Sequence, residues 1–358
     1  MGIRPSGGTD SQLKPFKAAA VQAAPIYLDT PATIDKACAL IGEAARNGAS
    51  LVVMPEVFVP GYPYWNWLMT PLDGSKWFHR LHDAAIEVPG PEVLALGEAA
   101  RQHSVVVVIG VNERSPYGVG TLYNTMLTFD DEGELIGHHR KLVPTWAEKL
   151  TWAPGDGSSL RVHNTSVGPL GVLACGENTN TLARFALLAQ GELIHAASYI
   201  ALPTAPDDYD MCRAIEIRSA AHAFEGKLFN ITACSTISPE IIEMMAPAGP
   251  AAQEMLTRPR SAWSGVIGPD GAVVGDPLID SEGIVYAEVD LARCVEPTQM
   301  HDLTGHYNRF DVFDLTVDRR RRPAATFLDD AESTHGLDYP NQVPGTKGTK
   351  GTLNDKHP

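Results

Sequence analysis

The chain has 358 residues, with 28 Lys and Arg against 43 Asp and Glu, so its formal net charge is −15. This acidic excess disfavours binding to nucleic acid or to an anionic membrane surface. No apolar stretch reaches the roughly 18 residues that a transmembrane helix needs, and the first ten residues lack the apolar segment of a secretory signal. We therefore expect a globular cytoplasmic protein with no nucleic-acid or membrane partner.

The cysteines are five in number, far apart, and without any CxxC pair. An odd, scattered set argues against a disulfide framework and against a zinc site, so we expect no metal and a reducing compartment. Four of them, Cys38, Cys212, Cys234 and Cys294, fall in predicted helices or at a strand end and are interpreted as packing residues.

Strand and helix patterns alternate through the first half of the chain. Pro31 and Gly48 bracket a helix with one apolar face, and residues 126–141 have the pattern of a β-hairpin. The expected elements are a strand at 16–23, a helix at 30–47, a strand at 51–54, helices at 75–86 and 91–103, a buried strand at 105–111 and the hairpin at 126–141.

The second half continues in the same way up to residue 303. The expected elements are strands at 170–174 and 193–200 around a helix, a helix at 213–225, a strand at 227–234, a long surface excursion at 235–260, a hairpin at 264–277, a strand at 283–289 and a helix at 291–303. This pattern predicts a mixed α/β fold with helices outside. We expect a flexible N-terminus at 1–14, one domain at 15–318, and a largely disordered tail at 319–358 with a possible role in assembly.

One thiol lies where an α/β sheet usually binds its ligand. Cys175 follows the apolar run Leu170 to Ala174, at the carboxyl end of a predicted strand. The N–H groups of the turn and of the following helix would stabilise a thiolate there. Position alone is equally compatible with a nucleophile and with a buried packing thiol.

Two charged residues also follow predicted strands. Glu56 comes directly after the strand that ends at Met54, where partial burial would raise its pKa toward that of a useful base. Lys141 ends the hairpin and could steady a developing negative charge, with Glu148 facing the same region from a loop. Each residue alone is also compatible with an ordinary surface side chain.

Four ordered blocks resemble the nitrilase superfamily of Glu-Lys-Cys carbon–nitrogen hydrolases. They are PEVFVPGYP at 55–63, HRKLVPTWAEK at 139–149, GDG at 155–157 and LACGEN at 173–178, and GHYNRFDVFDLTV at 305–317 is typical of the nitrilase branch. The resemblance implies an α-β-β-α four-layer sandwich, with Glu56 as general base, Lys141 as cation, Cys175 as nucleophile and Glu148 as a positioning glutamate. It also implies no cofactor, and a homodimer or larger homo-oligomer such as a spiral or filament.

The chain departs from the pattern of this branch at two positions. Gly176 stands where Trp is usual, which predicts a differently shaped and roomier pocket, and Phe310 stands where Pro is usual in the late block. Aromatic residues near the catalytic blocks are candidates for lining that pocket. The candidate substrate-binding residues are Gly176, Trp146, Tyr62 and Tyr64, with Trp65 and Trp67 nearby; core packing is an equal alternative for each aromatic residue.

The sequence therefore predicts a nitrilase that converts an organic nitrile to a carboxylic acid and ammonia through a Cys175 thioimidate and thioester. An amidase or carbamoylase would use the same three residues, and a nitrile or cyanide hydratase would release the amide. A filament-forming scaffold without activity and a redox-sensing thiol protein are rivals from other classes. The intact Glu56, Lys141 and Cys175 argue against the scaffold, and the lone thiol argues against the sensor.

Overall fold

The computed structural model describes residues 14–203, 209–323 and 325. The chain divides into two compact units, residues 1–321 and 322–358, and the first is described below. Most of the expected flexible N-terminus and of the expected tail lies outside the described residues, so those expectations stay predictions. Within the described part, no helix combines the length and apolarity needed to cross a lipid bilayer.

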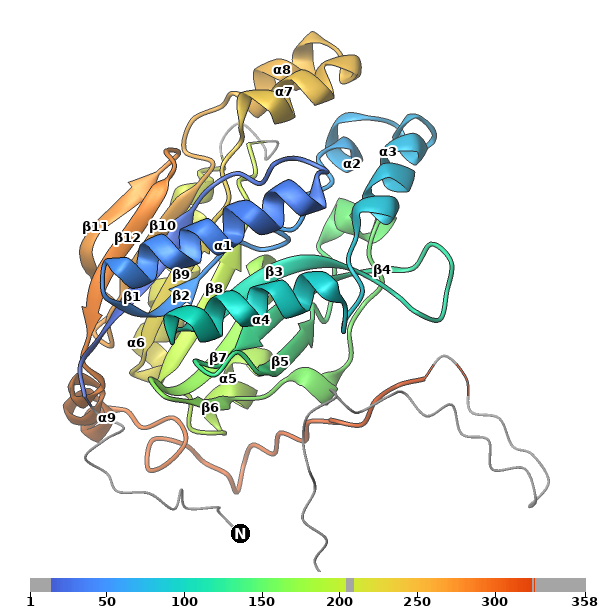
Figure 1. Ribbon diagram of the computed structural model, residues 1–358. Coiled ribbons are helices and arrows are strands. Elements are labelled where there is room, and N and C mark those ends of the chain that lie inside the picture. Colours follow the sequence, from blue (N-terminus) through green and yellow to red (C-terminus); the bar gives the residue numbers. More distant parts are fainter. Residues whose placement is uncertain (1–13, 204–208, 324, 326–358) are drawn as a thin grey trace, which may run out of the picture. The chain divides into compact units, whose positions relative to one another are not determined.

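Two six-stranded mixed sheets form the centre of the first unit (Figure 1). In spatial order, sheet A contains β12 (Gly283–Val289), β1 (Phe16–Gln22), β2 (Ala49–Val53), β3 (Val106–Arg114), β4 (Leu122–Phe129) and β5 (Leu135–Arg140). In spatial order, sheet B contains β11 (Val273–Ile279), β10 (Trp263–Ile267), β9 (Phe229–Cys234), β8 (Ile194–Tyr199), β7 (Gly168–Ala174) and β6 (His163–Thr165). In each sheet the three central strands are parallel and the outer pairings are antiparallel.

The sheets pack face to face because alternate residues of their central strands are apolar on both sides. One buried cluster contains Leu51 and Val106 of sheet A together with Val172, Ala196 and Ile231 of sheet B. The residues between them, such as Val52 and Val107, point outward from sheet A into a second cluster. Each central strand is therefore buried on both faces, as the continuous apolar runs predicted.

Helices cover the outer face of each sheet. Helices α1 (Thr30–Arg46) and α4 (Pro91–His103) pack on sheet A (Figure 1), and α5 (Thr181–Leu188) and α6 (Met211–Gly226) pack on sheet B. This is the α-β-β-α four-layer sandwich that the resemblance implied. The remaining helices are α2 (Trp65–Leu68), α3 (Pro71–Ala84), α7 (Pro239–Met245), α8 (Pro250–Leu256) and α9 (Val295–Met300), with 3₁₀ helices η1 (Trp146–Leu150), η2 (Gly157–Ser159), η3 (Cys175–Thr179), η4 (Ala246–Ala248) and η5 (Leu291–Cys294).

Both predicted hairpins are confirmed as the antiparallel pairs β4–β5 and β10–β11. The segment 235–260 differs from the expected surface excursion, because it contains α7 and α8. Their apolar residues Ile241, Met245 and Leu256 are buried against an aromatic cluster that includes Tyr64 and Trp65. The helix expected at 291–303 is shorter and forms η5 and α9.

Candidate active site

The site lies at the carboxyl ends of β2, β5 and β7, where open α/β sheets present their functional residues. Glu56 follows β2 in a segment that passes very close to β3. The N–H of Gly110 donates to the carbonyl of Pro55 at 3.0 Å, and a Cβ at residue 110 would lie only 2.6 Å from the Cα of Glu56. Only glycine permits this approach, which turns Glu56 into the interior, where it is 1% exposed.

Lys141 lies between two buried carboxylates. Its Nζ donates to Oε1 of Glu56 at 2.7 Å and to Oε2 of Glu148 at 2.8 Å, and the Lys141 and Glu56 side chains are fully buried. Burial opposes the charged ammonium, but the two carboxylates outweigh it and hold the pKa of Lys141 well above its usual range. Glu56 is 85 positions from Lys141 along the chain and Glu148 is seven positions from it, and both carboxylates bond to the same nitrogen.

Glu148 is held by groups on three sides. Besides Lys141, its Oε2 accepts from the backbone N–H of Thr145 at 2.7 Å, and its Oε1 accepts from the Tyr62 hydroxyl at 3.1 Å. The Tyr62 oxygen in turn accepts from Trp67 Nε1 at 2.9 Å. The Thr145 contacts form a capping box at the start of η1, so the local helix start fixes the direction of the Glu148 side chain.

Glu56 keeps one oxygen free. Its Oε1 accepts from Lys141 and from Asn124 Nδ2 at 2.6 Å, whereas its buried Oε2 has no hydrogen-bond partner among the described residues. Burial raises the pKa of Glu56 to about 7, with Lys141 opposing the shift and Glu148 adding to it. The predicted rise in pKa is confirmed, and the free oxygen can take a proton near neutral pH.

Cys175 begins η3 with φ of 46°, in the left-handed region that non-glycine residues rarely adopt. It is 7% exposed and belongs to a buried cluster with Tyr199 and Ile215. Burial raises the pKa of the Cys175 thiol above its usual range, Glu56 adds to the rise and Lys141 opposes it. Burial therefore outweighs any stabilisation of a thiolate by the turn N–H groups, so the thiol is neutral and needs a base.

The candidate pocket residues are placed differently from one another. Tyr62 contacts Glu148, as described above, whereas the Tyr64 hydroxyl donates to the Ala201 carbonyl at 3.0 Å and its ring packs on Tyr62 at 5.1 Å. Trp146 is 73% exposed at the start of η1, with its ring edge-on to Trp67. The sequence proposed Tyr62 and Tyr64 equally as pocket residues; both pack in the aromatic cluster, and Tyr62 in addition bonds to Glu148.

The space beside Gly176 is occupied. A Cβ at this position would lie 2.6 Å from Oγ1 of Thr145, the same residue whose N–H holds Glu148. The hydroxyl of Thr145, four residues after Lys141, thus occupies the extra room expected from a glycine in place of Trp. Phe310, at the other departure from the pattern, is 57% exposed and lies outside every described helix and strand.

A second buried polar cluster lies behind Cys175. Asn178 Nδ2 donates to the Cys175 carbonyl at 3.1 Å, and its Oδ1 lies 2.8 Å from His195 Nε2. Glu192 contacts His195 Nδ1 at 2.6 Å and His222 Nε2 at 2.9 Å. Glu192, His195 and His222 are of residue types that bind zinc. However, both carboxylate oxygens of Glu192 already bond to the two histidines, which hold the three side chains together without an ion. Burial and His195 lower the pKa of His222 to about 4, so this ring is neutral at pH 7.

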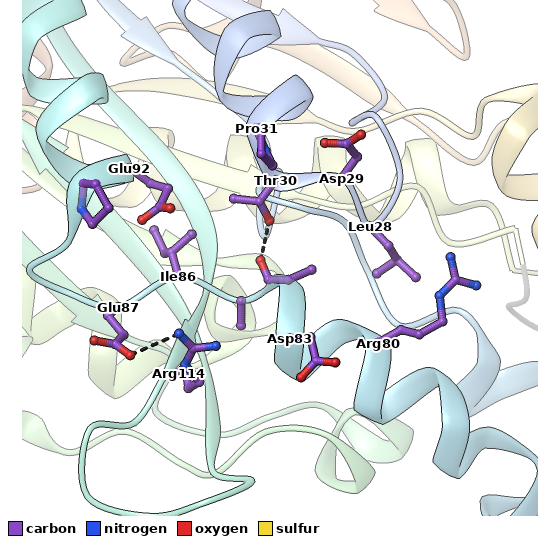
Figure 2. Close-up of a pocket in the computed structure, with 13 residues that line it drawn as sticks. Leu28, Asp29, Thr30, Pro31, Arg80, Asp83, Ile86, Glu87, Glu92 and Arg114 are labelled. Atoms are coloured by element: carbon purple, nitrogen blue, oxygen red, sulfur yellow. Dashed lines mark hydrogen bonds and ion pairs between the residues drawn. The ribbon is translucent and has the colours of Figure 1, made fainter.

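A surface pocket of about 680 Å³ lies elsewhere, beside the N-termini of α1 and α4 (Figure 2). Its charged lining includes Arg80, Asp83 and Arg114, and Arg114 donates to Glu87 at 3.0 Å. The described residues that line it include none of the four catalytic candidates. The pocket is therefore separate from the Glu56–Lys141–Cys175 site.

Comparisons with known proteins give the family of this chain. A model of the carbon-nitrogen hydrolase family matches residues 17–298. The chain belongs to the carbon-nitrogen hydrolase family. An aliphatic nitrilase of Rhodococcus rhodochrous is 37% identical over 329 residues, which are 90% of this chain and 88% of that protein. A bifunctional nitrilase/nitrile hydratase of Nicotiana tabacum is 37% identical over 319 residues, covering 87% and 88% of the two chains.

A solved structure has the same fold as this carbon-nitrogen hydrolase. The carbon-nitrogen hydrolase of Helicobacter pylori G27 superposes with a TM-score of 0.62 over 83% of this chain and 97% of that chain, at 22% identity. At this identity the likeness concerns the fold, and it confirms the sandwich. The family model also ends at residue 298, before the late block at 305–317 that resembles the nitrilase branch.

Proposed function

We propose that this carbon-nitrogen hydrolase is a nitrilase, which converts an organic nitrile and two waters to a carboxylic acid and ammonia. The observation that carries the proposal is Lys141 held between Glu56 and Glu148, with one Glu56 oxygen free and a buried thiol that interacts electrostatically with all three. The nitrilase names of the relatives, at 37% identity over most of the chain, support the choice of nitrile as substrate.

The first half of the reaction forms a thioimidate. The free Oε2 of Glu56 takes the proton from the Cys175 sulfur, and the sulfur forms a bond to the nitrile carbon. The carbon–nitrogen triple bond becomes a double bond, and its nitrogen takes the proton back from Glu56. Lys141 remains protonated and stabilises the negative charge as it moves between these atoms.

The second half replaces nitrogen by oxygen. Glu56 takes a proton from water, whose oxygen adds to the thioimidate carbon, and the tetrahedral species is stabilised by Lys141 and the Gly176 N–H. Glu56 passes the water proton and then the hydroxyl proton of the tetrahedral species to the nitrogen. The carbon–nitrogen bond then breaks, ammonia leaves, and the carbonyl of a thioester remains. A second water, activated by Glu56, releases the acid and returns the proton to sulfur. Glu148 acts by positioning Lys141.

Substrate contacts are assigned to the residues around this centre. Tyr62 and Gly176 lie beside Glu148 and Cys175, and Trp146 lies next to Thr145 at the exposed start of η1. We assign these three to the substrate pocket. Tyr64 supports the pocket from behind by packing on Tyr62.

A nitrile hydratase activity is the second candidate. The tetrahedral species can lose either its nitrogen, which gives the acid, or its sulfur, which gives the amide. The named bifunctional relative performs both activities, which supports testing for both products. An amidase or carbamoylase would use the same residues and would start from an amide instead.

The test is an ammonia-release assay over aliphatic, aromatic and arylacetonitrile substrates and, in separate reactions, over the matching amides, with product analysis for acid and amide. Acid from nitriles and none from amides is expected. Cys175→Ala should abolish turnover while Cys38→Ser, which changes a half-buried cysteine on α1, should leave it unchanged. Turnover of amides alone, or activity retained in Cys175→Ala, would overturn the proposal.

We also propose that the enzyme works in the cytoplasm as a homodimer or larger homo-oligomer, with spirals or filaments among its forms. All five cysteines are unpaired, which suits a reducing compartment. Large apolar side chains are exposed on α5 and α6, where Leu182 is 63% and Phe224 52% exposed, and a second copy would cover them. Light scattering on the full chain measures the assembly; a monomer at all concentrations would contradict it.

A further inference from the structure

One buried carboxylate connects the two strands that supply the lysine and the thiol. Oε2 of Glu177 accepts from the N–H of Ala174 at 2.9 Å, and its Oε1 accepts from the N–H of Leu142 at 2.7 Å. Ala174 directly precedes Cys175 and ends β7 in sheet B, whereas Leu142 directly follows Lys141 after β5 in sheet A. We propose that Glu177 is a positioning residue, which sets the spacing between Lys141 and Cys175 by holding one backbone N–H beside each.

The charge of this carboxylate is balanced from β5. His139 Nε2 lies 3.1 Å from Oε2 and 3.2 Å from Oε1 of Glu177, and His139 Nδ1 contacts the Ser159 hydroxyl at 3.0 Å. Burial alone would raise the pKa of Glu177, but His139 and the two N–H groups outweigh burial and lower it. The carboxylate is therefore ionised at neutral pH, when both of its oxygens can accept.

A second buried carboxylate, that of Glu113 on β3, also contacts side chains of β5 and provides the contrast. Glu113 accepts from Thr125 at 2.7 Å and Arg140 Nε at 3.0 Å, and it contacts His138 at 2.8 Å. Residues 138 and 140 point to one side of β5 and residue 139 to the other, as the alternation of a strand requires. The side-chain partners of Glu113 named above all lie in sheet A, whereas Glu177 joins sheet B to the end of β5. Both carboxylates stabilise the fold, but only Glu177 connects the lysine strand to the nucleophile strand.

The two N–H donors explain why the side chain must be a carboxylate. Each oxygen accepts one backbone N–H, so both oxygens are needed as acceptors. A glutamine has one acceptor oxygen and one NH₂ group, which would face an N–H and push it away. Glu177→Gln therefore keeps the size of the side chain but releases either Ala174 or Leu142, and moves Cys175 or Lys141 with it.

The inference rests on the proposed function for its kinetic test, so a second readout is independent of it. We compare Glu177→Gln with the matched control Glu113→Gln by kcat and KM on the best nitrile, by thermal unfolding, and by the rate of Cys175 alkylation with iodoacetamide, read by peptide mass spectrometry. Both variants should lose similar thermal stability. Only Glu177→Gln should lose kcat, by about 10- to 100-fold with KM nearly unchanged, and only it should change the Cys175 alkylation rate.

The possible results separate the inference from the proposed function. Unchanged kcat and alkylation in Glu177→Gln, or equal losses in Glu113→Gln, would overturn the positioning role. A wild-type chain that hydrolyses no nitrile would overturn the proposed function, and the alkylation rates would still decide the role of Glu177. If Glu177→Gln does not fold, Glu177→Asp, whose shorter side chain reaches only one of the two N–H groups, should give the same selective loss of kcat.

Discussion

The acid limb of the pH profile should report the protonation of Glu56 and should move in opposite directions in two variants. Because the pKa of Glu56 is raised to about 7, kcat/KM for nitrile hydrolysis should fall tenfold per pH unit below that value as the base gains a proton. Asn124 donates to Glu56 at 2.6 Å and so stabilises its charged form. Asn124→Leu removes a hydrogen bond to a charged group, worth about 1.5–3 kcal/mol. The pKa of Glu56 should rise, and the acid limb should shift to higher pH by about 1–2 pH units.

Glu148→Gln should move the limb the other way. Its Oε2 and the Glu56 Oε1 both lie within hydrogen-bond distance of Lys141 Nζ. The two oxygens are thus at most about 5.5 Å apart, and at an effective dielectric constant of 20 their charges repel by about 3 kcal/mol. Removing that repulsion should lower the limb by up to about 2 pH units.

The assay is ammonia release, with kcat/KM measured from about pH 5 to about pH 9 at constant ionic strength for the wild type, Asn124→Leu and Glu148→Gln. The variants will be slower, but the position of the limb does not depend on the absolute rate. A limb that stays at the wild-type pH in both variants would refute the assignment of Glu56 as the titrating base.

Three further predictions concern stability and specificity. Burial would raise the pKa of Glu113, but His138 and Arg140 outweigh burial and lower it to about 2. This carboxylate therefore adds stability above its unfolded pKa of 4.5 that is lost as pH falls toward 2. Thermal unfolding from pH 5 to 2 should show this loss, and Glu113→Gln should lose less stability than the wild type over that range, by on the order of 3 kcal/mol, while Glu192, whose pKa is also lowered to about 2, still titrates in both. Gly176→Ala should impair turnover by displacing the Thr145 hydroxyl, and adding Thr145→Ala should partly restore it; additive losses would contradict the contact. Trp146→Ala should change the relative rates for aliphatic and aromatic nitriles, and an unchanged profile would place Trp146 outside the pocket.

The fold and the main site residues could be predicted because both depend on local patterns. Apolar runs located β2 and β7, which precede Glu56 and Cys175, and the hairpin pattern located β5, which precedes Lys141. The sequence assigned the three residues to one region by treating them as strand ends of a single sheet; the structure divides them between two sheets, with Cys175 after a strand of sheet B. The resemblance then supplied the roles that position alone left open.

The supporting residues could not be predicted, because their roles depend on contacts across the sheets. Asn124 lies within a buried strand, where a polar residue has no local explanation, and its partner Glu56 is 68 residues away. Glu177 stands two residues after Cys175, and only the cross-sheet contact to Leu142 shows what it holds. The predicted hairpin began at residue 126, so Asn124 lay outside every predicted strand, whereas β4 begins at Leu122. A polar residue buried inside a strand requires a partner, and only the correct strand start would have shown that signal.

The charge state of Cys175 shows how burial changed a prediction drawn from local geometry. Two carboxylates, of Glu56 and Glu148, surround the ammonium of Lys141 inside the protein. Further buried negative charge would be costly, so the pKa values of Glu56 and Cys175 are both raised. Lys141 holds its proton firmly, because its pKa is raised well above the usual range. The proton that reaches the nitrile nitrogen must therefore come through Glu56, whose free oxygen is the one acceptor in this group without a partner in the described structure. On this argument a single negative charge moves from carboxylate to sulfur to substrate, while the lysine stays protonated throughout.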